Sequence, residues 1–224
     1  MKYVILIGVL LLTVGVIYYA LKRPPFPNTL LINLESRKDR LENVMAAFSH
    51  WPVKPERIDA IKATPGWKGC TLSHLKCIET AKSRGYPWVL YIEDDCYMTR
   101  TGLRQFMDVL PYLWANRDKW DIFSGATSKL DSYKKMSSNP PLFQVTGYAS
   151  HFVLVNGAAY DKIINAIDKN APPVIDHFYK WNVRIWATAP YIALQAESKS
   201  DIQEGVKNYD MLFKKSEKTL LAAI

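Results

Sequence analysis

Three consecutive carboxylates, Glu93, Asp94 and Asp95, follow a short apolar run in the stretch WVLYIEDDC, residues 88–96. Adjacent like charges repel, so these acids either point apart into water as a solvated turn or share a cation. If the chain stays extended, Glu93 and Asp95 project to the same side. Two such carboxylates suit Mg²⁺ or Mn²⁺, whose open positions phosphate oxygens can fill. The spacing is compatible with a metal site at Glu93 and Asp95, and a solvated turn stays the alternative because acids often follow strands.

A second group of polar residues surrounds the strand that we expect to open the domain. This strand, residues 29–33 (TLLIN), ends at Asn33 and Leu34, and Arg37 and Arg40 follow in the turn and the first helical turn. Arginine side chains and the N-terminal amides of a helix both suit a phosphate or diphosphate. The alternative is that the two arginines belong to a solvated helix face.

A predicted helix over residues 71–83 carries Ser73 and His74 and leads into the acidic strand. In an open α/β sheet, ligands gather at the carboxyl ends of strands, so this helix borders the expected site. A lone histidine is more often packed or hydrogen-bonded in a core, which is the alternative for His74.

The three cysteines, Cys70, Cys77 and Cys96, are predicted to be structural thiols. Their number is odd and no pair has CxxC spacing, which argues against a disulfide framework. No nearby set of residues resembles the ligands of a zinc site.

Strands and helices alternate along the sequence, which predicts an α/β fold with a largely parallel sheet covered by helices. With 224 residues, of which 49% are hydrophobic, the chain is long enough for one domain with a substantial core. Ser36 is the expected N-cap of the first helix, and residues 129–141 are expected to form a mobile polar loop near the acceptor. The expected strands are 29–33, 88–92, 121–125, 143–147 and 151–155, and the expected helices are 36–48, 71–83, 102–115 and 156–167.

The chain is basic, with 29 Lys and Arg against 21 Asp and Glu, a net charge of +8 and a pI of about 9.3. Such a surplus suits an anionic ligand, a membrane surface or nucleic acid. No dense Lys/Arg block and no zinc-finger or RNA-binding motif is present, so no nucleic-acid partner is expected.

The N-terminal segment, residues 3–21, carries no charge and is long enough to cross the hydrocarbon core of a bilayer as a helix. A cleaved signal peptide is the alternative, but it usually has a shorter apolar core and a small-x-small cleavage site. We therefore predict a membrane anchor at residues 1–22, a Pro-rich linker at 23–28 and the catalytic domain at 29–224. More Lys and Arg follow the span than precede it, which places the domain in the cytoplasm; a lumenal orientation is the alternative.

Several motifs occur together in an order that resembles glycosyltransferase family 25, the lipopolysaccharide and collagen galactosyltransferase-like group. The resemblance extends over roughly residues 29–202, and the ordered set is far more specific than any one motif. The motifs are INLESRKDR (32–40), GCTLSHLKCIETA (69–81), WVLYIEDD (88–95), YASHFVLVNGAAYDKII (148–164), PPVIDHF (172–178) and, more loosely, SDI (200–202).

The resemblance implies a GT-A-like fold, a UDP-sugar donor and a divalent metal, Mn²⁺ or Mg²⁺, at the acidic motif. It implies that Glu93 and Asp95 hold the metal and that Asp176 is the catalytic base. A galactose-like hexose would pass to a glycan, lipopolysaccharide, lipid-linked or protein acceptor, with inversion expected. The donor-binding residues that it implies are Asn33, Leu34, Arg37, Arg40, Ser73, His74 and Asp94.

Two other functions stay open from the sequence. A Mg²⁺-dependent nuclease could use the triplet Glu197-Ser198-Lys199 with Asp95, although these lie about a hundred residues apart. A protein that kept the fold and lost turnover would act as a binding or scaffolding module. Most tryptophans are expected to pack in the core or at its rim, and Trp181 and Trp186, which follow Asp176, are the two candidates for stacking on an acceptor sugar.

Overall fold

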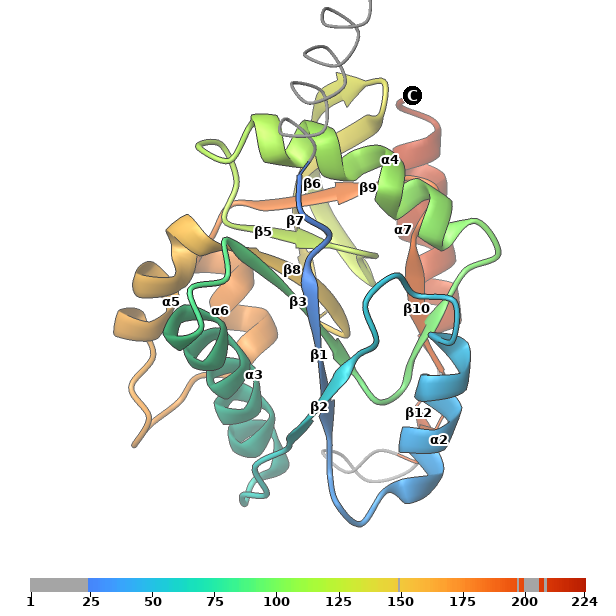
Figure 1. Ribbon diagram of the computed structural model, residues 1–224. Helices are drawn as coiled ribbons and strands as arrows, with labels where there is room; N and C mark the ends of the chain where they lie inside the picture. The colour runs from blue at the N-terminus through green and yellow to red at the C-terminus, as the bar shows by residue number, and fades with distance from the viewer. Residues whose placement is uncertain (1–23, 149, 197, 200–205, 208) are drawn as a thin grey trace, which may run out of the picture.

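The computed structural model describes residues 24–148, 150–196, 198–199, 206–207 and 209–224, shown in Figure 1. Its helices are α2 (Lys38–Ala47), α3 (Gly66–Ser83), α4 (Gly102–Ala115), α5 (Tyr160–Ala166), α6 (Ile175–Asn182) and α7 (Asp210–Leu221), and a 3₁₀ turn, η1 (Gly157–Ala159), precedes α5. The strands are β1 (Asn28–Asn33), β2 (Glu56–Asp59), β3 (Trp88–Glu93), β4 (Cys96–Met98), β5 (Ile122–Ser124), β6 (Lys129–Ser138), β7 (Pro141–Tyr148), β8 (Phe152–Asn156), β9 (Ile185–Thr188), β10 (Ala193–Gln195), β11 (Ser198–Lys199) and β12 (Val206–Lys207).

A single large sheet organises these elements, with the strand order β2-β1-β3-β8-β5-β9-β7-β6. Strands β2, β1, β3, β5, β9 and β6 run in one direction, whereas β8 and β7 run in the other. The predicted α/β fold, with most strands running one way and helices on both faces, is therefore confirmed. The refinement is that β8 lies antiparallel between β3 and β5.

Alternating apolar residues divide the core into two layers, because successive side chains of a strand point to opposite faces. On β3, Val89 and Tyr91 are buried beneath α3, α5 and α6, which cover one face of the sheet (Figure 1). Leu90 and Ile92 are buried on the other face, beneath α2 and α4. Strand β8 repeats the alternation, so the central strands are apolar on both sides. A continuous apolar run of this kind is typical of a strand buried on both faces.

The second helix begins at Gly66, several residues before the predicted start at residue 71. Gly66 and Gly69 lie in the added first turns of this helix. A Cβ on Gly69 would lie 2.2 Å from the backbone oxygen of Ile61. The absence of a side chain at Gly69 therefore lets α3 approach residues 61–63 closely.

Two further expectations are corrected. Ser36 does not cap the first helix: Arg37 is the N-cap residue, and its N–H donates to Leu34 O at 2.9 Å, which closes a turn around Ser36. Residues 129–141 are not a loop but include β6, which pairs with β7 as a hairpin. β6 is polar because it is an exposed edge strand, and lysines on an edge oppose pairing with other chains.

The segment before β1 is held against the domain. Trp88 Nε1 donates to Pro25 O at 3.0 Å, and the Phe26 ring packs on Trp51 and Phe106. Within the part of the chain that the structure describes, no helix has both the length and the apolar character needed to cross a membrane. The span predicted for residues 3–21 lies outside the described residues.

Candidate functional site

A cavity of about 900 Å³ opens at the carboxyl edge of the parallel strands β1, β2 and β3. This is the edge at which ligands bind in open α/β sheets, and the volume is in the range of small-molecule sites. All of the predicted site residues except Arg37 line it. They are Asn33, Leu34, Arg40, Ser73, His74, Glu93, Asp94, Asp95 and Asp176.

Asp94 joins the end of β3 to the first strand and the first helix. Its Oδ2 accepts a 2.7 Å hydrogen bond from Asn33 Nδ2, and its Oδ1 forms a 2.8 Å ion pair with Arg40. Asn33 Nδ2 also donates to Arg37 O, so one amide fastens both the acid and the start of α2. Burial raises the pKa of Asp94, against the opposing effect of Arg40. Both carboxylate oxygens of Asp94 already have partners within the protein, so this residue stabilises the cavity wall.

Asp95 presents a carboxylate oxygen that the protein leaves unsatisfied. Its Oδ2 accepts from Gln195 Nε2 at 3.0 Å and lies 3.9 Å from Arg40, whereas its Oδ1 is buried without a hydrogen-bond partner. Burial, followed by the negative charge of Glu93, raises the pKa of Asp95 to about 7. A buried oxygen without a partner costs free energy, which a bound cation would recover. Asp95 therefore fits a metal ligand.

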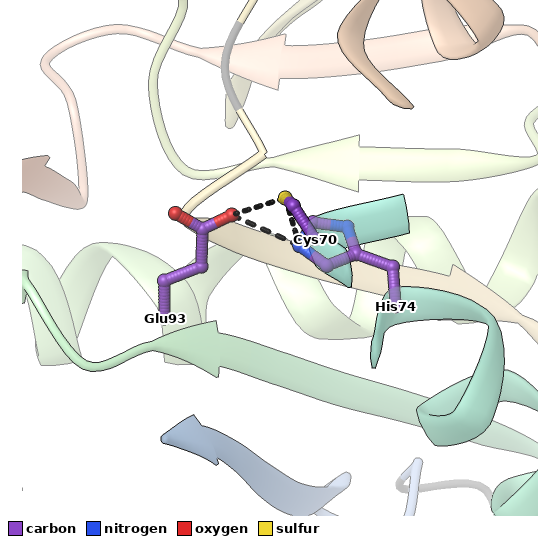
Figure 2. Close-up of side chains that lie close together, drawn as sticks. All are labelled: Cys70, His74 and Glu93. Atoms are coloured by element: carbon purple, nitrogen blue, oxygen red, sulfur yellow. Dashed lines mark hydrogen bonds and ion pairs between the residues drawn. The ribbon is translucent and has the colours of Figure 1, made fainter. Parts of the chain in front are cut away.

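The Glu93 side chain points toward α3. The chain does not stay extended after it, which was the condition for Glu93 and Asp95 to project to the same side. β3 ends at Glu93, and residues 94–95 form a turn. The Oε1 of Glu93 lies 2.9 Å from His74 Nε2, 3.3 Å from Ser150 Oγ and 4.0 Å from Cys70 Sγ, and Figure 2 shows the first and third of these contacts. Burial is the largest single influence and would raise the pKa of Glu93, but the combined effect of His74, His151 and Ser150 outweighs it and the pKa is lowered. Glu93 is thus a buried anion with its own partners.

Ser73 supports the cavity wall from within the protein. Its hydroxyl donates to Gly69 O at 2.7 Å and accepts from the backbone N–H of Ile61 at 2.8 Å. Both bonds are internal, and they hold residues 60–64, which line the cavity, against α3. The effect of Ser73 on a ligand would therefore be exerted through this segment.

The remaining predicted residues lie at different depths. Asp176 is in the first turn of α6 and lines the cavity. Arg37 lies outside the lining and pairs with Asp39 at 3.1 Å.

Trp181 is 70% exposed, whereas Trp186 is buried at 1% and cannot stack on a sugar, which corrects that expectation. Glu197, on which the nuclease alternative depends, lies outside the described residues.

Many of the lining residues were not predicted as site residues, and Cys70, Ser150, His151 and Gln195 are among them. Cys70 stands four residues before His74, a spacing that places both side chains on one face of a helix and could have signalled the pair. Ser150 and His151 lie within the resemblance to family 25 without a role attached to them. Gln195 had no signal, since only the pairing of β10 with β4 brings it to Asp95.

The raised pKa of Asp95 predicts how the stability of the cation-free protein depends on pH. The folded pKa of about 7 exceeds the ordinary value of 3.8, so the folded state holds the extra proton and its stabilising effect is lost as the pH rises toward 7. Between about pH 5 and pH 8, the free energy of unfolding should fall by about 3 kcal/mol through this group.

Asp95→Asn should remove that part of the pH dependence and raise the melting temperature at about pH 8 by roughly 5 °C or more. Thermal and urea unfolding in the presence of a chelator measure both effects. Asp59→Asn, which changes an exposed acid at the end of β2, is the matched control. An unchanged slope in Asp95→Asn would show that another group carries the pH dependence.

No family model and no curated protein sequence matches this chain. Among solved structures, it resembles a glycosyltransferase involved in the glycosylation of the major capsid of PBCV-1, at 10% identity over 87% of this chain and 100% of the other, with a TM-score of 0.50. Weaker similarities join it to A197 from STIV, at 10% identity, 82% and 95% coverage and a TM-score of 0.46. Mannose-1-phosphate geranyltransferase from Thermus thermophilus follows at 7% identity, 75% coverage of each chain and a TM-score of 0.44. The first similarity shows a shared glycosyltransferase-like fold, and the other two carry no inference.

Proposed function

We propose that this chain is a membrane-anchored glycosyltransferase that transfers a galactose-like hexose from a UDP-sugar to a glycan, lipopolysaccharide, lipid-linked or protein acceptor, with inversion. The observation that carries the proposal is that residues far apart in the sequence, predicted together as a donor and metal site, line one cavity. The ordered motifs resembling family 25 and the fold shared with the PBCV-1 glycosyltransferase support it. The anchor at residues 3–21 and the cytoplasmic side are part of the proposal.

A divalent cation would help a nucleoside diphosphate to enter this cavity, although Lys62 and Lys129 also line it. Glu93, Asp94, Asp95 and Asp176 all line it, and Arg40 is already paired with Asp94. The carboxylates would repel a diphosphate in the absence of a counter-charge. Held by Asp95 and Glu93, Mn²⁺ or Mg²⁺ would supply positive charge against the diphosphate leaving group.

The protein's own residues would divide the remaining work. Arg40, at 11% side-chain exposure, offers a guanidinium at the cavity wall to a donor oxygen. Residues 60–64 and α3 form the opposite wall and enclose the donor. Asp176 would accept the proton of the acceptor hydroxyl while an electron pair of that oxygen forms the new bond to the anomeric carbon. The bond from this carbon to the diphosphate would break, and UDP would leave with its electron pair.

The first test is calorimetry of UDP binding to the 224-residue chain, with and without Mn²⁺. We expect Mn²⁺ to strengthen UDP binding by more than about tenfold, and Asp95→Ala to abolish this gain. Asp59→Ala, an acid at the end of the neighbouring strand β2 but outside the cavity lining, should keep it. The absence of any metal-linked nucleotide binding in the wild type would overturn the proposal.

Turnover is tested separately, as UDP release from a set of UDP-hexoses in the presence of candidate acceptors. Release that depends on both Asp95 and an acceptor supports transfer. Tight UDP-sugar binding without release would show a binding protein that has kept the fold and lost catalysis.

A further inference from the structure

We propose that Cys70, His74 and Glu93 form a binding site for a thiophilic divalent cation, Zn²⁺. The three side chains come from two elements that the fold brings together. Cys70 and His74 lie one turn apart on α3, and Glu93 ends β3. Within the described residues they are the group of His, Cys, Asp and Glu side chains whose ligand atoms all lie within 4.8 Å of one another (Figure 2). The proposal rests on these contacts and does not depend on sugar transfer, but it shares Glu93 with the proposed Mn²⁺ site, so the two ions would compete for that carboxylate.

The distances between the ligand atoms are close to those of a tetrahedral zinc site. Zn–S and Zn–N or Zn–O bonds of about 2.3 and 2.1 Å imply S···N and S···O separations of about 3.6 Å and an N···O separation of about 3.4 Å. Cys70 Sγ lies 3.8 Å from His74 Nε2 and 4.0 Å from Glu93 Oε1. His74 Nε2 and Glu93 Oε1 are 2.9 Å apart. Shifts of about half an ångström would therefore complete the geometry.

The surroundings hold the ligands in place before an ion arrives. The His74 side chain is 1% exposed, and its ring lies against Tyr91 and Tyr179, with centroids 4.6 and 6.5 Å away. Ser150 Oγ donates to the same Glu93 oxygen. A site whose ligands are already oriented loses little conformational entropy when it binds.

Charge and proton balance are consistent with a cation at this point. The negative charges of Glu93, Asp176 and Asp95 surround Cys70, and after burial they are what raises the pKa of its thiol. Binding would release the Cys70 proton to solvent, since the thiolate is the ligand. With Nε2 as the ligand, the neutral His74 ring would carry its proton on Nδ1, for which the structure shows no hydrogen-bond partner, and this burial would cost part of the binding free energy. A thiolate and a carboxylate then neutralise the two charges of the ion.

The ligand types select the metal and indicate its use. A thiolate with an imidazole favours Zn²⁺ over Mg²⁺ or Mn²⁺, which prefer oxygen ligands. Three protein ligands leave the fourth tetrahedral position open, as in catalytic zinc sites. Because all three residues line the cavity, that position would take an oxygen of water or of a bound anion.

Co²⁺, which replaces Zn²⁺ and reports its ligands, provides the test on the 224-residue chain. We expect about one equivalent to produce a thiolate-to-cobalt charge-transfer band and the strong visible bands of tetrahedral Co²⁺, both removed by Zn²⁺. Cys70→Ala should abolish the charge-transfer band and weaken Zn²⁺ binding by more than about 100-fold, since even losing an outer partner costs about 10–100-fold.

Cys77→Ala is the matched control, because Cys77 is a buried thiol on the same helix and outside the cavity lining. Retention of the band in Cys70→Ala, or its absence in the wild type, would overturn the proposal. If Cys70→Ala does not fold, alkylation of the wild type decides: Zn²⁺ should protect Cys70 from modification, and unprotected Cys70 would refute the site. Mn²⁺-linked UDP binding is measured in parallel, so that failure of the zinc site and failure of the transferase proposal are separate results.

Discussion

Replacing Asp176 by Asn is expected to lower the rate of sugar transfer by about 10²–10⁴-fold while UDP still binds. The residue lies in the first turn of α6 and lines the cavity together with the acids at the end of β3. Asn keeps the shape of the side chain but cannot accept a proton from an acceptor hydroxyl. The change should therefore reduce turnover and leave nucleotide affinity within about threefold, which UDP release and calorimetry measure on the same preparation.

Asp161→Asn is the matched control for this prediction. Asp161 occupies the first turn of α5, as Asp176 does in α6, but it forms an exposed ion pair with Lys82 and does not line the cavity. Exposed pairs contribute little to stability, so this variant should transfer sugar at the wild-type rate. If Asp176→Asn lost UDP affinity and turnover to the same extent, Asp176 would be a binding residue. Wild-type turnover would exclude it as the base.

Gly69→Ala is expected to lower the free energy of unfolding by about 3 kcal/mol, the upper range for overpacking a well-packed site. The new Cβ would lie 2.2 Å from Ile61 O and 3.0 Å from the backbone N of Ala63. These neighbours are backbone atoms, so the segment 61–63 must move as a whole. The displacement would also strain the bond from Ile61 N to Ser73 Oγ. Urea unfolding measures the loss of stability.

The contrast with Gly85 separates crowding from backbone conformation. Gly85 has a φ of +66° after the end of α3, and a Cβ there would meet nothing within 4 Å. Gly85→Ala should therefore cost only about 1 kcal/mol, through the left-handed conformation. Because residues 60–64 line the cavity, Gly69→Ala should also weaken UDP binding, and Gly85→Ala should not. Equal effects of the two substitutions would contradict the close approach of α3 to residues 61–63.

The main elements of the fold could be predicted because their signals are local. The apolar run of Trp88–Glu93 and the amphipathic pattern of Gly102–Ala115 each follow the period of one kind of element, and both appear in the structure as predicted. Strand β6 could not be predicted as a strand, since most of its residues are exposed and its sequence has no apolar alternation. Its pairing with β7 depends on how the whole sheet assembles and leaves no signal in the sequence of β6 itself.

The candidate site also has a part that could be predicted from the sequence and a part that could not. The acids at the end of β3 and the polar residues after β1 could be placed at one sheet edge, because parallel strands deliver their carboxyl ends together. The partners of those acids could not be predicted. His74 meets Glu93 through the packing of α3 on β3, and Gln195 meets Asp95 through a strand pair separated by about a hundred residues. Contacts of this kind have no period in the sequence.

The antiparallel place of β8 also sets the order in which the sheet can assemble as the chain leaves the ribosome. Strands β1, β2 and β3 can pair early, but one edge of β3 has no partner until Phe152–Asn156 has been synthesised. Strand β5 needs that same β8, and its other neighbour β9 arrives only at Ile185–Thr188. Such non-local pairing is slow, and an apolar strand edge left open during synthesis invites aggregation. The two halves of the sheet can thus be joined only after β8 has been synthesised, and the half that contains β5 stays incomplete until β9 follows it.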